Sequence, residues 1–318
     1  MISVAVTTFN GEKYIRKQIE SILNQSMKVD EIIVCDDGST DKTVEILKEY
    51  PVTVYQNEKN LGYRLNFKKA MSLCTQEYTF LCDQDDIWKP DKVKTMIEIM
   101  QKNPNIHVLA SSFEYIDSKD NLILMKQKKN FSNNNLYPKS VKSEALVPVV
   151  FDEYLPMNYF QGCSLVLDKW IKDLVLKNFD DRLPHDWLIS MIASSYQGMF
   201  FFNKALFKYR LHENNSIGVE HLTQSTSEHI QKANSANIRM QNSANALIVL
   251  EDIEKVNPAF YASREKEFKN LKQFLVQHNK NLENKNFFGL LKQNTSPFYK
   301  LIKTKKARIM DLIFALKK

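Results

Sequence analysis

The chain has 318 residues, of which 43% are hydrophobic and 25% are charged. This composition indicates a globular protein of one large or two modest domains. The net charge of +7 is compatible with an anionic substrate, a nucleic acid or an anionic membrane surface. Nucleic-acid binding is disfavoured, because the basic residues are spread out and no recognised nucleic-acid-binding module is present.

The cysteines and the first residues of the chain indicate the cellular compartment in which the protein is expected. No two of the four cysteines have the spacing of a metal finger or a Cys-x-x-Cys motif, so we read them as small buried residues under reducing conditions. The chain starts with an apolar run without a basic leader, and no apolar run is long enough to span a bilayer. We therefore expect a cytoplasmic protein.

Apolar, β-rich segments alternate with amphipathic helical segments over the first hundred residues. Strands are expected at 2–6, 31–35, 52–55 and 78–82, and helices at 14–23, 44–47, 65–73 and 91–100. This rhythm predicts an α/β domain with a mostly parallel sheet.

Polar residues follow three of these strands at the point where each strand ends. They are residues 7–10, Asp36 with Asp37, and residues 83–86. In an open parallel sheet all three sets lie along one edge, where such folds bind ligands. Asp37, taken as unpaired, can accept a hydrogen bond from the imide N–H of uracil or thymine. No glycine-rich phosphate loop follows the first strand, so a metal ion is the remaining way to hold a diphosphate.

Residues 83–86 place three carboxylates within four positions, directly after an apolar run. Such carboxylates repel one another unless a cation shares the site, and Mg²⁺ or Mn²⁺ prefers oxygen ligands. The alternative is aspartate as turn former and helix cap, which explains Asp86 and Asp91 well and Asp83 poorly.

The next hundred residues hold further candidates. Residues 108–113 form another apolar segment, and 117–147 are expected to be either a mobile lid or a plain surface loop. A strand is expected at 159–167, and the chain enters it through Gln161 and Gly162. Glycine at such a position often marks a close approach of the backbone to a ligand. Asp186 begins an apolar helix, and its position alone favours a structural role in the field of the helix dipole.

The composition changes near residue 219. Helices are expected at 230–256 and 258–282, within a helical region of about one hundred residues. The segment 297–318 is basic and amphipathic, which is typical of a helix lying on a membrane surface. A helix packed on its own domain or on a partner subunit remains the alternative.

Four ordered motifs carry a resemblance to a known family: residues 3–11, 25–26, 32–41 and 83–86. They resemble glycosyltransferase family 2, whose members are inverting, metal-dependent enzymes of the GT-A fold that use nucleotide-diphosphate sugars. The resemblance implies a Rossmann-like mixed sheet with a C-terminal helical appendage. We expect a catalytic domain at 1–218, with a nucleotide-binding half at 1–104 and an acceptor half at 105–218, followed by a helical region at 219–318.

The resemblance also implies roles for single residues. Asp186 is expected to be the catalytic base that takes the acceptor's proton. Asp83, Asp85 and His212 are expected to hold Mn²⁺ or Mg²⁺, with Asp85 the more direct ligand. His185 and Trp187 are expected to contact the acceptor. The expected donor-binding residues are Thr7, Phe9, Asn10, Asp36, Asp37, Asn66, Asp83, Gln84, Trp88, Gly162 and Arg210, with Asp86 shaping the same pocket.

The expected reaction moves a sugar from a UDP- or dTDP-sugar to a glycan, lipid-linked or protein-linked acceptor in bacterial surface glycan synthesis. The runs 185–187 and 207–215 resemble bacterial rhamnosyltransferases. Membrane contact through 297–318, at the inner face of the cell membrane, and a homo-oligomer are further expectations. The alternatives are a non-catalytic binding subunit of the same fold and a sugar nucleotidyltransferase, which usually carries a glycine-rich phosphate loop that is missing here.

Overall fold

The computed structural model describes residues 1–212 and 235–317. The described residues form two compact units, one of 1–149 with 159–212 and the other of 150–158 with 235–317. The expected boundary at 218/219 lies outside the described residues.

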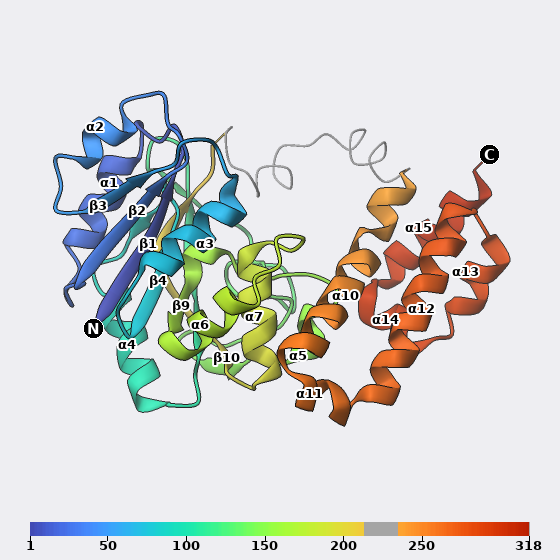
Figure 1. The fold of residues 1–318 in the computed structure, drawn as a ribbon. Helices are drawn as coiled ribbons and strands as arrows, with labels where there is room; N and C mark the ends of the chain where they lie inside the picture. Colours follow the sequence, from blue (N-terminus) through green and yellow to red (C-terminus); the bar gives the residue numbers. More distant parts are fainter. Residues whose placement is uncertain (213–234, 318) are drawn as a thin grey trace. The chain divides into compact units, whose positions relative to one another are not determined.

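The first unit is built on one ten-stranded sheet with the order β3-β2-β1-β4-β9-β6-β10-β5, in which β7 also pairs with β6 and β8 with β10 (Figure 1). Four strands form its parallel half: β1 (Ile2–Thr8), β2 (Glu31–Asp36), β3 (Thr53–Gln56) and β4 (Tyr78–Cys82). These are the four strands expected from the apolar runs.

The other half of the sheet is mixed. Strand β9 (Leu165–Asp168) runs antiparallel to both neighbours, whereas β6 (Val108–Ile116) and β10 (Met199–Arg210) are parallel to each other. Three short strands complete the sheet: β5 (Ile87–Trp88), β7 (Leu122–Ile123) and β8 (Leu146–Pro148).

Helices bury apolar faces against this sheet. They are α1 (Ile15–Leu23), α2 (Thr43–Leu47), α3 (Tyr63–Leu73), α4 (Lys92–Lys102), α6 (Lys169–Lys177) and α7 (His185–Ser195). In α1, the residues Ile15, Ile19 and Ile22 recur at helical spacing and are fully buried. Every residue of α7 is buried, so this helix lies inside the unit.

One expectation for the first unit was wrong in detail. The segment around Gly162 is a 3₁₀ turn (Gly162–Ser164), and the strand begins only at Leu165. The segment 117–147 is mostly loop, with the two-residue β7 near its start and the first residues of β8 at its end, and its fully buried Tyr137 packs against Phe160 and Phe201.

The second unit is helical. It consists of α5 (Phe151–Tyr154), α10 (Ala236–Val256), α11 (Pro258–Ser263), α12 (Glu265–Glu283), α13 (Phe287–Gln293), α14 (Pro297–Ile302) and α15 (Lys305–Leu316). The segment 297–318 is thus two helices, and the Thr304 side chain accepts a hydrogen bond that caps the second. None of the described helices combines the length and hydropathy needed to cross a bilayer.

A buried charge cluster joins three helices of this unit. The carboxylate of Asp311 is fully buried and receives Arg239 at 2.9 Å, Lys303 at 2.7 Å and the hydroxyl of Tyr299 at 2.6 Å. Buried charges persist when they are paired and hydrogen-bonded. Asp311 therefore links α10, α14 and α15.

Candidate active site

Three loops leave the same edge of the parallel half of the sheet. The strand register pairs Thr8 with Asp36 and Val6 with Cys82, so the segments that follow β1, β2 and β4 emerge together. The side-chain amide of Gln84 joins two of them, because it accepts from the Phe9 N–H at 2.8 Å and donates to the Phe9 carbonyl at 3.0 Å. Gln84 and Phe9, both predicted to bind the sugar donor, are therefore hydrogen-bonded to each other.

Asp36 and Asn10 hold the loop after β2. The Asp36 carboxylate is fully buried and accepts from the Thr8 hydroxyl at 2.9 Å and the Ser39 N–H at 2.9 Å. Asn10 has a positive φ of 49° and accepts from the Thr40 N–H at 2.9 Å. Asp36 has no exposed surface that could contact a sugar donor, so its contribution is to shape the loop at this edge of the sheet.

Asp37 was expected to be unpaired, and this premise was wrong. Its carboxylate accepts hydrogen bonds from the Leu61 N–H at 2.7 Å, the Gly62 N–H at 2.9 Å and the Asn57 amide at 2.8 Å. The reason is local, since the loop before α3 leaves backbone N–H groups that need acceptors. Thr7 was expected to contact the nucleobase of the sugar donor together with Asp37. It lies at the end of β1, with 8% of its surface exposed.

Two other predicted donor contacts are enclosed in the core. Asn66 is 2% exposed and donates to the Cys35 carbonyl at 2.8 Å. Trp88 is 3% exposed and packs on Phe80, with ring centroids 5.5 Å apart. Both residues expose little surface for a direct contact with a sugar donor.

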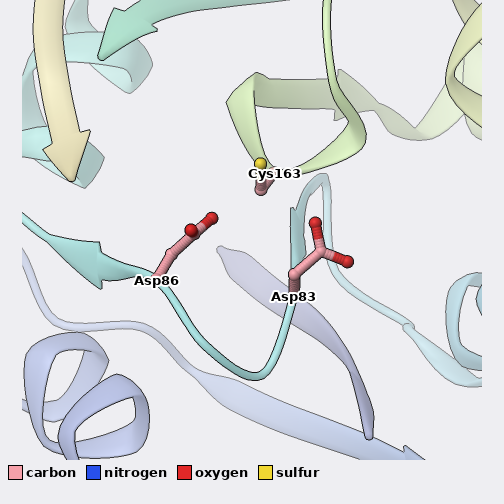
Figure 2. A group of neighbouring side chains, drawn as sticks. All are labelled: Asp83, Asp86 and Cys163. Carbon is pink, nitrogen blue, oxygen red and sulfur yellow. The ribbon is translucent and has the colours of Figure 1, made fainter. Parts of the chain in front are cut away.

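Asp83, Asp86 and Cys163 form an acidic cluster (Figure 2). Their ligand atoms lie within 4.8 Å of one another. Burial raises the pKa of Asp83 to about 7, and the neighbouring charge of Asp85 adds to the shift. Burial, followed by the charges of Asp85 and Asp83, raises the pKa of Asp86 well above its usual range. A cation would relieve this crowding of negative charge.

Sequence reasoning missed Lys92, which lies close to this cluster. The side chain is fully buried and donates to the Cys163 carbonyl at 2.7 Å. Burial lowers the pKa of Lys92 to about 8, while its positive charge lowers the pKa of Asp83. A signal was present, because Lys92 lies four residues before Met96 and therefore on the apolar face of α4.

The second acidic residue of the loop, Asp85, lies against His212. Its carboxylate is 2.7 Å from Nε2 of the histidine, although 127 residues separate them in the chain. Among the described residues, the predicted metal set is therefore divided between two neighbouring groups. Asp85 lies with His212, and Asp83 lies with Asp86 and Cys163.

Arg210 was expected to bind the diphosphate, but its guanidinium is buried beneath the loop. Nε donates to the Asp85 carbonyl at 2.6 Å, and the Arg210 N–H donates to the Asp86 carboxylate at 3.0 Å. A guanidinium nitrogen pairs with Asp120 at 2.5 Å, and the group lies 4.5 Å from the ring centre of Tyr14. Arg210 thus positions both acidic residues, and it has no exposed side-chain surface for a phosphate.

Asp186 lies in the first turn of α7, near the acidic cluster. Burial raises its pKa to about 6, although the N–H groups of Trp187 and Gly162 oppose the shift by hydrogen bonding to the carboxylate. The charge of Asp186 in turn raises the pKa of Asp83. A carboxylate with a pKa of about 6 is ionised at neutral pH and is still basic enough to accept a proton.

His185, the residue before Asp186, is buried. Its ring stacks on Phe67 with centroids 4.1 Å apart, and a Cβ at Gly162 would meet its Nε2 at 2.6 Å. Burial lowers the pKa of His185 to about 3, so the ring is neutral. Trp187 is 5% exposed and offers an acceptor little surface. The charge of Arg64, which also lowers the pKa of His185, was not anticipated from the sequence.

Comparison with known proteins identifies the family. A family model described as Glycosyl transferase family 2 matches residues 3–154. A Methanocaldococcus jannaschii protein, named an uncharacterized glycosyltransferase, is 30% identical over 222 residues, which are 66% of this chain and 71% of that protein. This chain belongs to glycosyltransferase family 2.

Another relative and a solved structure agree with this assignment. A dTDP-rhamnosyl transferase of Shigella flexneri is 27% identical over 232 residues, covering 67% of this chain and 73% of that protein. The crystal structure of S. aureus TarS residues 1–349 with UDP-GlcNAc matches with a TM-score of 0.58 at 15% identity, covering 99% of this chain and 89% of that chain. The predicted GT-A fold and the predicted glycosyltransferase class are confirmed.

Proposed function

We propose that this family 2 glycosyltransferase moves a sugar from a UDP- or dTDP-sugar to a hydroxyl group of a glycan, lipid-linked or protein-linked acceptor, with inversion at the anomeric carbon. The convergence of Asp83, Asp85, Asp186 and His212 supports it most. Asp85 contacts His212, and the charges of Asp85 and Asp186 both act on Asp83. The dTDP named for one relative and the UDP-GlcNAc of the TarS structure favour these two donor classes.

Asp83, Asp85 and His212 are the residues that we propose hold Mn²⁺ or Mg²⁺. Carboxylate oxygens and an imidazole nitrogen suit such cations. Cys163 fits less well, because burial raises the pKa of its thiol well above the usual range and hard cations disfavour sulfur. Asp86 is 1% exposed and already accepts the Arg210 N–H. When bound, the cation offsets negative charge on the departing nucleoside diphosphate.

Asp186 is the proposed base of this reaction. Its carboxylate takes the proton of the acceptor hydroxyl as the acceptor oxygen bonds to the anomeric carbon and the bond to the diphosphate oxygen breaks. Hydrogen bonds from the N–H groups of Gly162 and Trp187 hold the carboxylate.

We also take residues 1–218 as the catalytic domain and 219–318 as an appended helical region. Such a protein would serve in bacterial surface glycan synthesis, in keeping with the rhamnosyl transferase among its relatives.

The substitution Asp186→Asn tests the proposal. The variant should bind a nucleotide sugar as the wild type does, while transfer falls by about 10²–10⁴-fold because the base is lost. In the wild type, kcat should fall about tenfold per pH unit below pH 6, since protonated Asp186 cannot accept a proton. Release of nucleoside diphosphate in the presence of acceptor is the assay, and EDTA should abolish it until Mn²⁺ is restored.

Asp181→Asn serves as the control, because Asp181 is exposed and lies five residues before Asp186. Its activity should equal that of the wild type. Full transfer by Asp186→Asn would exclude Asp186 as the base, and full activity in EDTA would remove the cation from the proposal.

A further inference from the structure

The helices α13 to α15 lie in a segment of concentrated positive charge. Residues 285–318 contain nine lysine and arginine residues and one acidic residue, Asp311. The excess of positive over negative side chains in this segment is larger than the net charge of +7 of the whole chain. Asp311 is fully buried and paired with Arg239 and Lys303. The described surface of this segment therefore carries basic side chains and no acidic ones.

The outer face of α15 is apolar. Ile309, Ile313 and Leu316 are 48%, 41% and 66% exposed. Their spacing of four and three residues puts them on one side of the helix. Lys305 and Lys306, one turn earlier, are exposed as well. The helix thus presents apolar side chains beside lysines to solvent. Its opposite side packs into the core of the helical unit through Phe314.

The neighbouring helix α13 shows the same combination. Phe288 is 79% exposed and Leu291 is 47% exposed, and Lys292 beside them is exposed too. The two helices pack against each other through a core that contains Leu290 and Phe314 (Figure 1). Both members of one helix pair therefore expose large apolar side chains with adjacent positive charge.

We propose that α13 and α15 dock this protein on a bilayer that contains anionic phospholipid. Exposed apolar side chains enter the region between headgroups and acyl chains, and lysines beside them bind anionic headgroups. Charge complementarity favours this occupant over a second copy of the chain, because two such faces would bring like charges together. The proposal does not depend on the transfer reaction, and it predicts reversible attachment at the surface.

Co-sedimentation of the full chain with vesicles tests this surface. Binding is expected to phosphatidylcholine vesicles that contain roughly a quarter of phosphatidylglycerol, and it should weaken strongly in high salt. Vesicles of phosphatidylcholine alone should retain little protein. Equal binding to both kinds of vesicle, or no binding to either, would overturn the proposal.

Matched variants locate the contact. Ile309→Gln should lower the partition coefficient about tenfold, while Ile238→Gln on α10, where the isoleucine is 46% exposed, should leave it unchanged. Lys305→Gln should lower the coefficient about fivefold, and Lys266→Gln on the exposed side of α12 should not. Circular dichroism melting identifies any variant that fails to fold.

The competing occupant gives a different result. A second copy of the chain on this face would appear as a dimer in sedimentation equilibrium, would be broken by Ile309→Gln and would show no vesicle binding, which contradicts the membrane proposal. Loss of vesicle binding with transfer activity retained would support the docking role and leave the proposed reaction untouched.

Discussion

Replacing Gly162 with alanine tests how tightly the turn before β9 fits against α7. The added Cβ would lie 2.6 Å from Nε2 of His185, far inside the optimal separation of about 3.5–4.0 Å. His185 has little room to move, because its ring stacks on Phe67 at 4.1 Å and 5% of the residue is exposed. The same turn donates the Gly162 N–H to Asp186, so relief of the clash must shift that carboxylate.

Overpacking of this kind costs about 1–3 kcal/mol. We expect the free energy of unfolding of the first unit to fall by about 2 kcal/mol and kcat to fall at least about tenfold, because a small displacement of a reacting group slows transfer steeply. All three tryptophans, Trp88, Trp170 and Trp187, lie in that unit. Urea unfolding followed by tryptophan fluorescence therefore reports its stability.

Gly11→Ala is the control at the same edge of the sheet. An added Cβ there would also clash, but with the amide end of Gln84, which is partly exposed and can rotate away from Phe9. We expect a loss of about 1 kcal/mol from the weakened hydrogen bonds. If Gly162→Ala lost no more stability than Gly11→Ala and kept its kcat, His185 would be freely mobile and the reasoning would be refuted.

Two further predictions concern the buried arginines. Arg210→Lys should lower transfer and destabilise the first unit by about 1–3 kcal/mol, because a lysine cannot reach the Asp85 carbonyl and Asp120 together; unchanged kinetics would show that Asp85 needs no such support. Asp311→Asn should lower the melting temperature of the helical unit through a loss of about 3–5 kcal/mol, since it leaves Arg239 and its neighbours buried without a counter-charge. Calorimetry checks the second, and an unshifted transition would contradict it.

Much of the fold could be predicted because its signals are local. Apolar runs of strand length marked β1 to β4, and the helical patterns between them required parallel pairing. The antiparallel β9 between β4 and β6 could not be read in this way, because nothing in the run 165–168 specifies which distant strands it pairs with. The burial within the segment 117–147 was missed for a similar reason, since its polar composition conceals the buried Tyr137.

The acidic residues of the candidate site could be proposed from the sequence, but most of their contacts could not. Asp83 and Asp85 stood out because carboxylates crowded directly after an apolar run need a cation or another reason, whereas Asp186 stood out only through the family resemblance. The partners of Asp37 did not, because they are backbone N–H groups of a loop, which every sequence carries. The burial of Arg210 could not be read from the sequence either, since a guanidinium can donate to a buried carbonyl as well as to a phosphate.

The complete burial of α7 limits how this enzyme can change. A helix with no solvent-facing side accepts few substitutions, because each altered volume is felt by its neighbours. Descendants that acquire a new acceptor must therefore do so through segments that surround the proposed base, and the helix that carries Asp186 would be inherited almost unaltered.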